Sequence, residues 1–374
     1  MAPLEMDESN NRSGKRRKIN VDNVSIIGSE SEKINEVDES DYRVAEDIFN
    51  MVLHIPLPLV LINKTTAIFK CRAEDIYRRI CKLMIPKLDR PIPESILQLH
   101  SLEELYVNCT KIDELPRWFG RLTSVKTLTI SLKFGGYLPE EISELPNLEV
   151  LNVSSSGKKL IFPRSFGNLT NLKCVSVESY VDHVAFPASM GSLTNLKTIR
   201  LQTHHFPEEI CDFSNLEYLS VHGNCIEELP TSIGSLKNLK ELTTQISGYE
   251  GSMASENIVP NEIGDLTSLE TLNLGYSNIA SLPRSIGNLK NLKTLYLHFS
   301  EITTLPDEIG CLTNLKDVDL RCHTLSTLPP TILNLKNLEH FHIIDESLLE
   351  DFSQLQIEML SKNLHCHMFS PRRR

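Results

Sequence analysis

The stretch "LPRSIGNLKNLKTLYLHFSEITT", residues 282–304, is followed at once by "LPDEIGCLTNLKDVDLRCHTLST", residues 305–327. Both stretches are 23 residues long, both begin with Leu-Pro, and their leucines and isoleucines fall at the same offsets. The residues between those positions differ. A constant skeleton with variable positions between its members indicates a tandem repeat, in which each unit packs against its neighbours.

The repeat runs through most of the chain. Eleven prolines have an apolar residue three positions later, and their usual spacing is 23 or 24 residues. They are Pro93, Pro116, Pro139, Pro163, Pro187, Pro207, Pro230, Pro260, Pro283, Pro306 and Pro329. An L-x-x-L-x-L core follows each proline, for example Leu292, Leu295 and Leu297. Units of this length predict stacked coils rather than separate globules.

The physical chemistry of the unit predicts its shape. The last two leucines of L-x-x-L-x-L are two residues apart, so a strand points both to one side. Proline cannot continue a strand ladder and therefore starts the return path of each coil. The glycines of "SIG" and "EIG" suit a turn with little room for a side chain; they are Gly234, Gly264, Gly287 and Gly310. One coil cannot bury its leucines alone, so coils stack and their strands form one parallel sheet.

These residues resemble leucine-rich-repeat proteins of the "LPxxIGxLxxLxxLxL" type, and the resemblance covers residues 91–346. The repeats are similar to those of Ras-pathway leucine-rich scaffolds, plant intracellular Ras-group proteins and plant disease-resistance proteins. The resemblance implies an α/β leucine-rich-repeat solenoid, curved like a horseshoe, with a parallel sheet on the concave face and helical caps at both ends. It also implies that the concave face binds a partner protein, in small-GTPase-pathway or immune signalling.

One departure from the family pattern concerns the asparagine that many such repeats place after the strand. It is present once, as Asn224, and the same position elsewhere holds Thr110, Ser156, Ser277, Ser300 or His323. Small hydroxyl groups still bond turn backbone. We therefore expect an inner hydrogen-bond ladder that is less regular than in the family.

The regions outside the repeats differ in kind. Residues 1–40 are polar and charged and predict a disordered tail. Residues 41–90 predict a helical N-terminal cap, because two apolar patterns have helical spacing: Val44, Ile48 and Val52, then Ile76, Ile80 and Leu83. Residues 91–346 hold about 11 coils, with an extra exposed loop at 247–257. Residues 347–374 predict a capping helix and a basic tail, the helix from Leu348, Phe352, Leu355 and Met359.

Residues 41–88 have a second interpretation. Substrate adaptors of ubiquitin ligases join a short helical box to leucine-rich repeats, and this segment has the right size for such a box. Its sequence lacks the Leu-Pro opening and the late Trp expected of one. A segment that docks on the first coil favours the cap, whereas one that protrudes favours the adaptor.

Composition excludes several classes of function. The 374 residues carry a net charge of −11, which argues against nucleic-acid binding. Nine cysteines without a CxxC pair are typical of a reducing compartment. The N-terminus does not read as a signal peptide, and the most apolar run, residues 51–62, is too short and too rich in proline to span a membrane. We expect a monomer in the cytoplasm, the nucleus or both, with nuclear import through Lys15, Arg16, Arg17 and Lys18.

Catalytic signatures are absent from the sequence. It contains no GxxxxGK(S/T) phosphate loop, no GxSxG elbow, no HExxH and no kinase motif. We therefore expect no enzyme activity, no catalytic residue and no cofactor. The nucleotide-binding module of a full-length plant immune receptor is missing as well.

The concave face can be read from the repeat. Variable residues of successive L-x-x-L-x-L units should stand in columns about 4.8 Å apart. The last three coils concentrate Tyr, Arg, His and Asp, among them the residue types that dominate binding hot spots. We predict a main partner-binding patch of Tyr296, His298, Phe299, Asp317, Asp319, Arg321, His340 and His342. A thinner second cluster holds Arg200, Tyr218 and His222.

Four residues of this patch allow two interpretations. Asp317 and Asp319 should face His340 and His342 on the next strand, in a rectangle of roughly 5 by 7 Å. Two histidines and two carboxylates at that spacing could hold Zn²⁺. The alternative is cross-strand Asp–His pairing, which raises the histidine pKa values. We favour the pairing and expect no metal, since an exposed strand surface lacks the supporting hydrogen bonds of metal sites.

Overall fold

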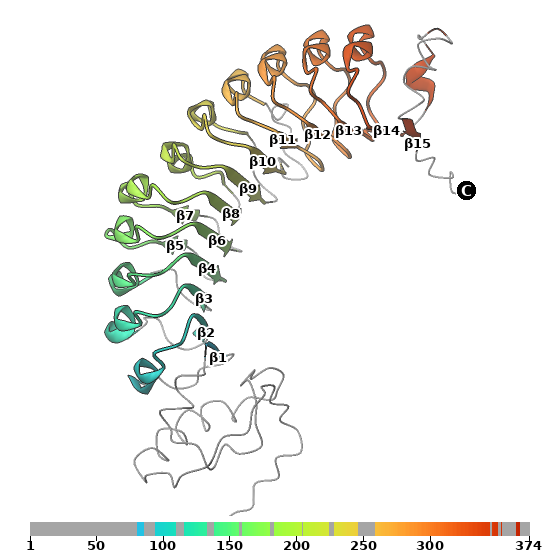
Figure 1. The fold of residues 1–374 in the computed structure, drawn as a ribbon. Helices are drawn as coiled ribbons and strands as arrows, with labels where there is room; N and C mark the ends of the chain where they lie inside the picture. The colour runs from blue at the N-terminus through green and yellow to red at the C-terminus, as the bar shows by residue number, and fades with distance from the viewer. Residues whose placement is uncertain are drawn as a thin grey trace, which may run out of the picture.

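A computed structural model describes residues 81–85, 94–109, 116–132, 138–156, 159–179, 183–203, 205–223, 228–245, 259–344, 346–350, 353 and 364–366. In these residues the chain winds into a curved solenoid (Figure 1). Strands line the inner side of the arc and short helical turns line the outer side (Figure 1). The expected leucine-rich-repeat solenoid, with its sheet on the concave face, is confirmed.

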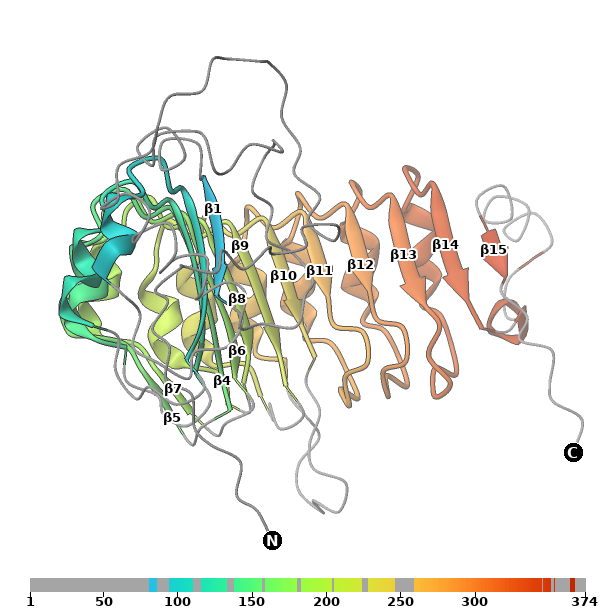
Figure 2. The ribbon, with the colours of Figure 1, turned by 90° about the horizontal axis from the view of Figure 1, so that it is seen from below.

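The inner side of the arc is one parallel sheet of 13 strands. Neighbouring strands follow one another in chain order, and Figure 2 shows the later ones, from β10 to β15, side by side. The strands are β1 (Lys82–Ile85), β2 (Glu104–Cys109), β3 (Thr127–Leu132), β4 (Val150–Ser155), β6 (Cys174–Ser179), β8 (Thr198–Gln202), β9 (Tyr218–His222), β10 (Glu241–Thr244), β11 (Thr271–Asn273), β12 (Thr294–Tyr296), β13 (Asp317–Leu320), β14 (His340–Ile343) and β15 (Leu364–Cys366).

The outer side of the arc consists of 3-10 turns. They are η1 (Glu94–Gln98), η2 (Arg117–Arg121), η3 (Glu140–Glu144), η4 (Phe166–Asn168), η5 (Ala188–Ser192), η6 (Glu208–Asp212), η7 (Thr231–Ser235), η8 (Asn261–Asp265), η9 (Arg284–Asn288), η10 (Asp307–Cys311), η11 (Pro330–Asn334) and η12 (Glu346–Leu349). Nine of these turns begin after a proline with φ between −67° and −76°. The carbonyl of Pro116, for example, accepts the Phe119 N–H at 2.9 Å. Proline therefore starts the outer turn, as the repeat predicts.

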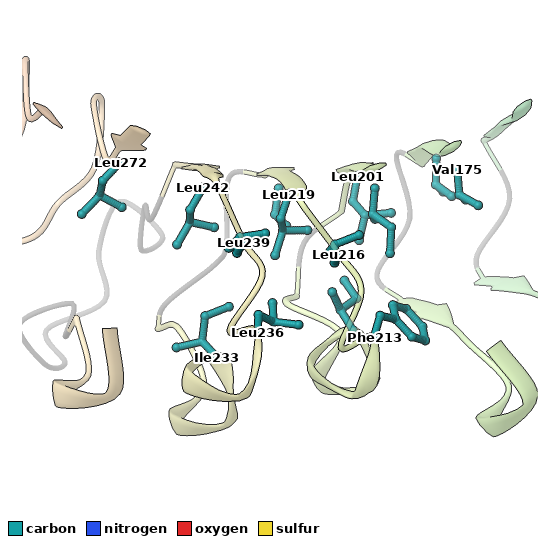
Figure 3. Close-up of a cluster of buried hydrophobic side chains, with 14 of the residues drawn as sticks. Val175, Leu201, Phe213, Leu216, Leu219, Ile233, Leu236, Leu239, Leu242 and Leu272 are labelled. Atoms are coloured by element: carbon teal, nitrogen blue, oxygen red, sulfur yellow. The ribbon is translucent and has the colours of Figure 1, made fainter. Parts of the chain in front are cut away.

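The core lies between the sheet and the outer turns. In β3, Leu128, Ile130 and Leu132 point inward and are buried, while the residues between them are partly exposed. Figure 3 shows the same arrangement in the middle coils, where Leu219 and Leu242 extend from the strands toward the outer turns. Each leucine removed from water stabilises the fold by about 1.5–3 kcal/mol. Each coil's leucines are covered in part by the neighbouring coils, so a single coil would leave them exposed to water.

Two coils carry an additional small sheet. Strands β5 (Lys159–Ile161) and β7 (His183–Ala185) pair in parallel just before Pro163 and Pro187, where the coils are 24 residues long. Behind them the rings of Phe162 and Phe186 stack with centroids 5.1 Å apart. Aromatic side chains thus fill the core where most coils use leucine.

Glycine in the outer turns permits close approach between coils. A Cβ on Gly264 would lie 2.4 Å from the Ser285 carbonyl oxygen, and one on Gly310 would lie 2.4 Å from the Thr331 carbonyl oxygen. Gly191, by contrast, has nothing within 4 Å of that position. The predicted lack of side-chain room is confirmed for Gly264 and Gly310, and it comes from the next coil.

Asparagine side chains tie the coils together just before each strand. Seven Nδ2 groups donate to a backbone carbonyl of the preceding coil at 2.7–2.8 Å. The donors are Asn147, Asn171, Asn195, Asn238, Asn291, Asn314 and Asn337. We expected the ladder after the strand, where Asn224 lies outside the described residues. Before the strand, a regular asparagine ladder joins the coils at seven positions, while after the strand Ser300 and Cys322 are also bonded between coils.

The two ends of the solenoid differ from prediction. Leu83 was predicted to belong to a cap helix, but it lies in β1, which pairs with β2. Leu83 and Ile85 alternate into the core, so the two-residue period of a strand decides the local structure. Residues 41–80 lie outside the described part, as do the loop 247–257 and residues 1–40.

At the C-terminus, the predicted cap region also contributes to the sheet. Leu348 lies in the short turn η12 and is buried, while Phe352, Leu355 and Met359 lie outside the described residues. Strand β15 then pairs with β14, so His342 lies beside His365 in the register. A strand therefore stands at residues 364–366, which we expected to belong to the tail, and most of the predicted helix lies outside the described residues.

Candidate functional site

The columns predicted for the concave face are present in the structure. Strand register places the middle residues of successive strands beside one another: Tyr106, Thr129, Asn152, Ser176, Arg200, Ser220, Thr243, Asn273, Tyr296, Asp319 and His342. The flanking columns keep the same register, so Asp317 lies beside His340 and Tyr218 beside Glu241. These side chains share one continuous surface along the inside of the arc.

One rim of this surface is a ladder of ion pairs between neighbouring coils. It is formed by the residue just before each strand: Glu103, Lys126, Glu149, Lys173, Lys197, Glu217, Lys240, Glu270, Lys293, Lys316 and Glu339. Each member pairs with a neighbour of opposite charge at 2.6–3.1 Å. Exposed pairs of this kind stabilise by only about 0–1 kcal/mol each. Their main effect is to leave this rim with almost no free charge.

On the opposite rim, two coils differ from those of β3 and β4 in the direction of the sixth residue counted from the start of the strand. In β3 and β4 the sixth strand residue points inward, and Leu132 and Ser155 are buried there. In the coils of β11 and β12 the strand stops after three residues, and the corresponding residues Tyr276 and Phe299 turn outward. The inward position is taken one residue later by Ser277 and the equivalent serine, Ser300, both buried.

The outward turn requires an unusual backbone conformation. Tyr276 has φ of 57° and Phe299 has φ of 56°. Residues with a Cβ pay about 1–2 kcal/mol to adopt this left-handed conformation. Backbone hydrogen bonds hold it, since the Tyr276 N–H donates to the His298 carbonyl at 2.8 Å and the Phe299 N–H to the Arg321 carbonyl at 3.0 Å.

The turned-out residues form a row of rings along three coils. Tyr276 and Phe299 stack with centroids 5.1 Å apart and an interplanar angle of 21°, and His323 lies 6.2 Å beyond Phe299. We call Tyr276, Phe299 and His323 the aromatic row. Sequence reasoning placed Phe299 in the patch but missed Tyr276 and His323. For Tyr276 the available signal was an aromatic residue followed by serine at the offset of Phe299, "GYS" and "HFS". His323 lies one position later in its coil, after the buried Cys322, and carries no such signal.

His298 lies under the aromatic row. Its ring meets Tyr276 edge-on at 5.0 Å and Phe299 at 5.9 Å. The ring occupies the space beside Gly275, where a Cβ would lie 2.5 Å from it. Gly275 thus belongs to the site because its missing side chain makes room for His298.

A bidentate ion pair forms the base of the site. Arg321 donates from Nε to Asp319 Oδ1 at 2.9 Å and from Nη2 to Oδ2 at 2.6 Å. His298 Nδ1 lies 3.6 Å from Asp319 Oδ2. Asp319 is 5% exposed, so it orients Arg321 and His298 and leaves little surface for a partner. Beside it, the Tyr296 hydroxyl donates to Asp317 Oδ2 at 2.9 Å.

The protonation states follow from these surroundings. Burial, together with the hydrogen bond to Asp317, raises the pKa of Tyr296 to about 12. Burial lowers the pKa of His298 despite the nearby Asp319 carboxylate. Burial acts to raise the pKa of Asp319, but the hydrogen bonds from Arg321 outweigh it and the pKa is lowered. At neutral pH the base of the site is a neutral Tyr296, a neutral His298 and a charged Asp319–Arg321 pair.

The predicted rectangle of carboxylates and histidines exists in the strand register but not as a metal centre. Asp317 lies beside His340 and Asp319 beside His342. Asp319 is bonded by Arg321, and the rings of His340 and His342 stack with centroids 6.4 Å apart. Within the described residues, no group of three or more His, Cys, Asp or Glu side chains is placed to hold a metal ion.

The second predicted cluster is spread over β8 and β9. Arg200 lies beside Ser220 in the middle column, and its Nη1 is 3.7 Å from the Cys174 Sγ. His222 shares a 2.8 Å hydrogen bond with Ser220, and burial lowers its pKa. Tyr218 is 42% exposed and lies beside Glu241. These residues line the same surface as the aromatic row but do not form a compact site.

Comparisons with known proteins agree with this geometry. The leucine-rich-repeat family model matches residues 267–321, which include Tyr276 and Phe299 of the aromatic row and end before His323. A second leucine-rich-repeat model matches residues 215–236. The fold is that of leucine-rich-repeat proteins. Adenylate cyclase from Schizosaccharomyces pombe is 40% identical over 80 residues, which are 21% of this chain and 4% of the cyclase.

Solved leucine-rich-repeat structures are more distant. An internalin (inlF) from Listeria monocytogenes is 20% identical, with 80% of this chain and 94% of that chain covered and a TM-score of 0.44. The structure of PEPR1–AtPEP1 is 20% identical over 82% of this chain and 48% of that chain, with a TM-score of 0.48. In the part of this chain that the structure describes, no helix has the length and apolarity needed to cross a bilayer.

Proposed function

We propose that this leucine-rich-repeat protein is a non-enzymatic recognition scaffold that binds a partner protein through the concave face of its last coils, in intracellular signalling or defence. The aromatic row is the centre of the contact surface, and Tyr296, Arg321, His340 and His342 flank it. The single observation that carries this proposal is the pair Tyr276 and Phe299, two exposed rings in a strained backbone conformation.

Exposure and strain together favour recognition over a purely structural role. In the described residues the exposed large apolar side chains are Tyr218, Tyr276 and Phe299, and all three border the concave surface. Exposed aromatic residues rimmed by polar groups are typical of protein interfaces. Left-handed backbone at bulky residues concentrates at functional sites, because folding alone does not favour it.

The non-enzymatic part of the proposal is supported by the chemistry of the site. The Asp319–Arg321 pair is fully engaged, and Tyr296 is neutral near pH 7 because its pKa is about 12. On the same face the Ser220 hydroxyl shares a 2.8 Å hydrogen bond with His222, and burial lowers the pKa of His222, which weakens it as a general base. The match to adenylate cyclase covers only 4% of that protein, so it gives no support for a cyclase reaction in this chain.

The test compares partner capture by three versions of the full chain in cells that express it naturally. The site variant carries Tyr276→Ser and Phe299→Ser. The control variant carries Ser131→Ala and Ser154→Ala, two substitutions on the same face in β3 and β4. Partners are identified by affinity purification and mass spectrometry, and circular dichroism verifies that each variant is folded.

The proposal predicts that specific partners are lost with the site variant and retained with the control. Partners retained by both variants would place the contact elsewhere on the chain. Loss with both variants would point to the whole concave face and would remove the special role of the aromatic row. Purified binding of one recovered partner then gives the affinity change, expected to exceed tenfold for two central aromatic residues.

A further inference from the structure

We infer that the segment recognised by this surface is basic: an extended stretch of a partner protein with two lysines or arginines about four residues apart. This inference rests on the proposed function and specifies the chemistry of its partner. The binding surface is the concave face over β9–β13, with the aromatic row along one side.

The charges over these strands are not balanced. The concave-facing columns of β9–β13 contain three acids and one base, namely Glu241, Asp317, Asp319 and Arg321. Asp319 and Arg321 neutralise each other. The rim ladder beside these strands is balanced, because each of its lysines pairs with a glutamate. Two carboxylates, Glu241 and Asp317, therefore have no lysine or arginine partner among the described residues, and His340 lies beside Asp317 in the register.

Each free carboxylate stands next to an aromatic ring. Glu241 is exposed and lies beside Tyr218 in the strand register. Asp317 accepts the Tyr296 hydroxyl, and its second oxygen is buried without a hydrogen-bond partner in the described part of the chain. A lysine or arginine side chain gains both from the carboxylate and from the electron-rich ring face. The buried histidines add no positive charge near pH 7, because burial lowers the pKa of both His222 and His298.

The spacing of the two carboxylates defines the spacing in the ligand. Glu241 and Asp317 occupy the same column, and three strand steps separate β10 from β13. Three steps of about 4.8 Å are roughly 14 Å, which an extended peptide crosses in about four residues. Side chains between the two basic residues then face the aromatic row, where apolar groups bury the exposed rings of Tyr276 and Phe299.

The experiment selects ligands without assuming their sequence. A display library of random 12-residue peptides is panned against the full chain, and the enriched peptides are synthesised. Binding is measured by fluorescence anisotropy at two salt concentrations. The variant Glu241→Gln with Asp317→Asn removes the two charges, and Asn keeps an acceptor for Tyr296. Glu178→Gln on β6 is the matched control, since Glu178 is an exposed acid of the same face outside β9–β13.

The expected result is enrichment of peptides with two lysines or arginines about four positions apart. Their affinity should fall by about tenfold in the double variant, remain unchanged in the Glu178→Gln control, and weaken as salt is raised. Enriched peptides that are neutral or acidic overturn the inference. If such peptides still need Tyr276 and Phe299, the proposed function survives that failure, whereas peptides insensitive to both sets of variants contradict the function as well.

The chain also has basic runs of its own, Lys15 to Lys18 and Arg372 to Arg374. A version with both runs changed to alanine tests whether the concave face binds a partner's segment or one of the chain's own basic runs. Equal peptide affinity before and after this change supports a partner segment as the occupant. Binding that occurs only after the change assigns the surface to the chain's own basic run and overturns the inference.

Discussion

Glycine at position 276 should stabilise this protein relative to alanine, in contrast to its usual effect. Both substitutions remove the Tyr276 ring, so the lost contacts cancel in the comparison. The left-handed conformation, with φ of 57°, costs an L-residue about 1–2 kcal/mol and costs glycine nothing. Glycine loses about 0.5–1 kcal/mol more conformational entropy on folding than alanine. Tyr276→Gly should therefore be more stable than Tyr276→Ala by roughly 0.7 kcal/mol.

Ser281 provides the matched control. It is exposed and lies in an extended connection without positive φ. Here Ser281→Gly should be less stable than Ser281→Ala by about 0.5–1 kcal/mol, because only the entropy difference remains. The free energy of unfolding of the glycine variant minus that of the alanine variant is thus positive at position 276 and negative at position 281. The change between positions equals the cost of the left-handed backbone.

Urea unfolding of the four full-length variants measures this difference. With a slope of about 3 kcal/mol per molar urea, the two glycine-minus-alanine differences should be separated by about 0.5 M in midpoint. Glycine less stable than alanine at both positions would refute the reasoning. The outward turn of Tyr276 would then be unstrained, and the argument from strain to recognition would lose its basis.

Three further predictions test the coil contacts, the buried histidine and the basic run. Gly264→Ala should destabilise by about 1–3 kcal/mol in urea unfolding, because its Cβ would meet the Ser285 carbonyl at 2.4 Å; Gly191→Ala, with open space around it, should cost nothing, and equal effects at both sites would contradict the close approach. The pKa of His298 in the folded protein lies below its usual 6.5, so as pH falls below about 6.5 the unfolded chain takes up the proton first and stability is lost. Between pH 7.5 and 5.5 the thermal unfolding midpoint should fall less steeply with pH for His298→Gln than for the unchanged protein. Identical slopes for the two proteins would exclude this contribution of His298. Changing Lys15, Arg16, Arg17 and Lys18 to alanine should shift a fluorescent fusion of the full chain from nucleus to cytoplasm, and an unchanged distribution would rule out this run as the import signal.

The repeat pattern predicted the sheet and its columns because both depend on spacing alone. Leucines two apart must share a side of a strand, and equal coil lengths then put equivalent residues in register. For this reason Tyr296, Asp319 and His342 fall in one column as expected. The same logic led us to predict the main patch in the last coils, and that prediction remains to be tested.

Spacing does not determine which groups bond to one another. We expected Asp319 to pair with the histidines of the following strand, but Arg321, two residues later on its own coil, reaches it with two hydrogen bonds. A guanidinium offers a bidentate geometry that an imidazole cannot match. The ends of the solenoid show a related limit. Leu83 fits both a helical and a strand period, and pairing with β2 decides between them.

The aromatic row shows how a strictly repeated skeleton can present a local exception. In β3 and β4 the sixth strand position is an inward one, and an aromatic ring there would have to fit between neighbouring coils. In the coils of β11 and β12 the core position moves one residue along to a small serine, and the ring at the sixth position turns to the solvent.

The exchange leaves the solenoid intact, because Leu274 and Leu297 before it and Ile279 and Ile302 after it remain fully buried. Its cost is the left-handed backbone at two residues, about 1–2 kcal/mol each. Glycine or asparagine at these two positions would adopt the same left-handed turn with little or no strain, so the turn itself does not call for an aromatic residue. The presence of tyrosine and phenylalanine at these two positions is therefore better explained by what their rings contact than by the stability of the fold.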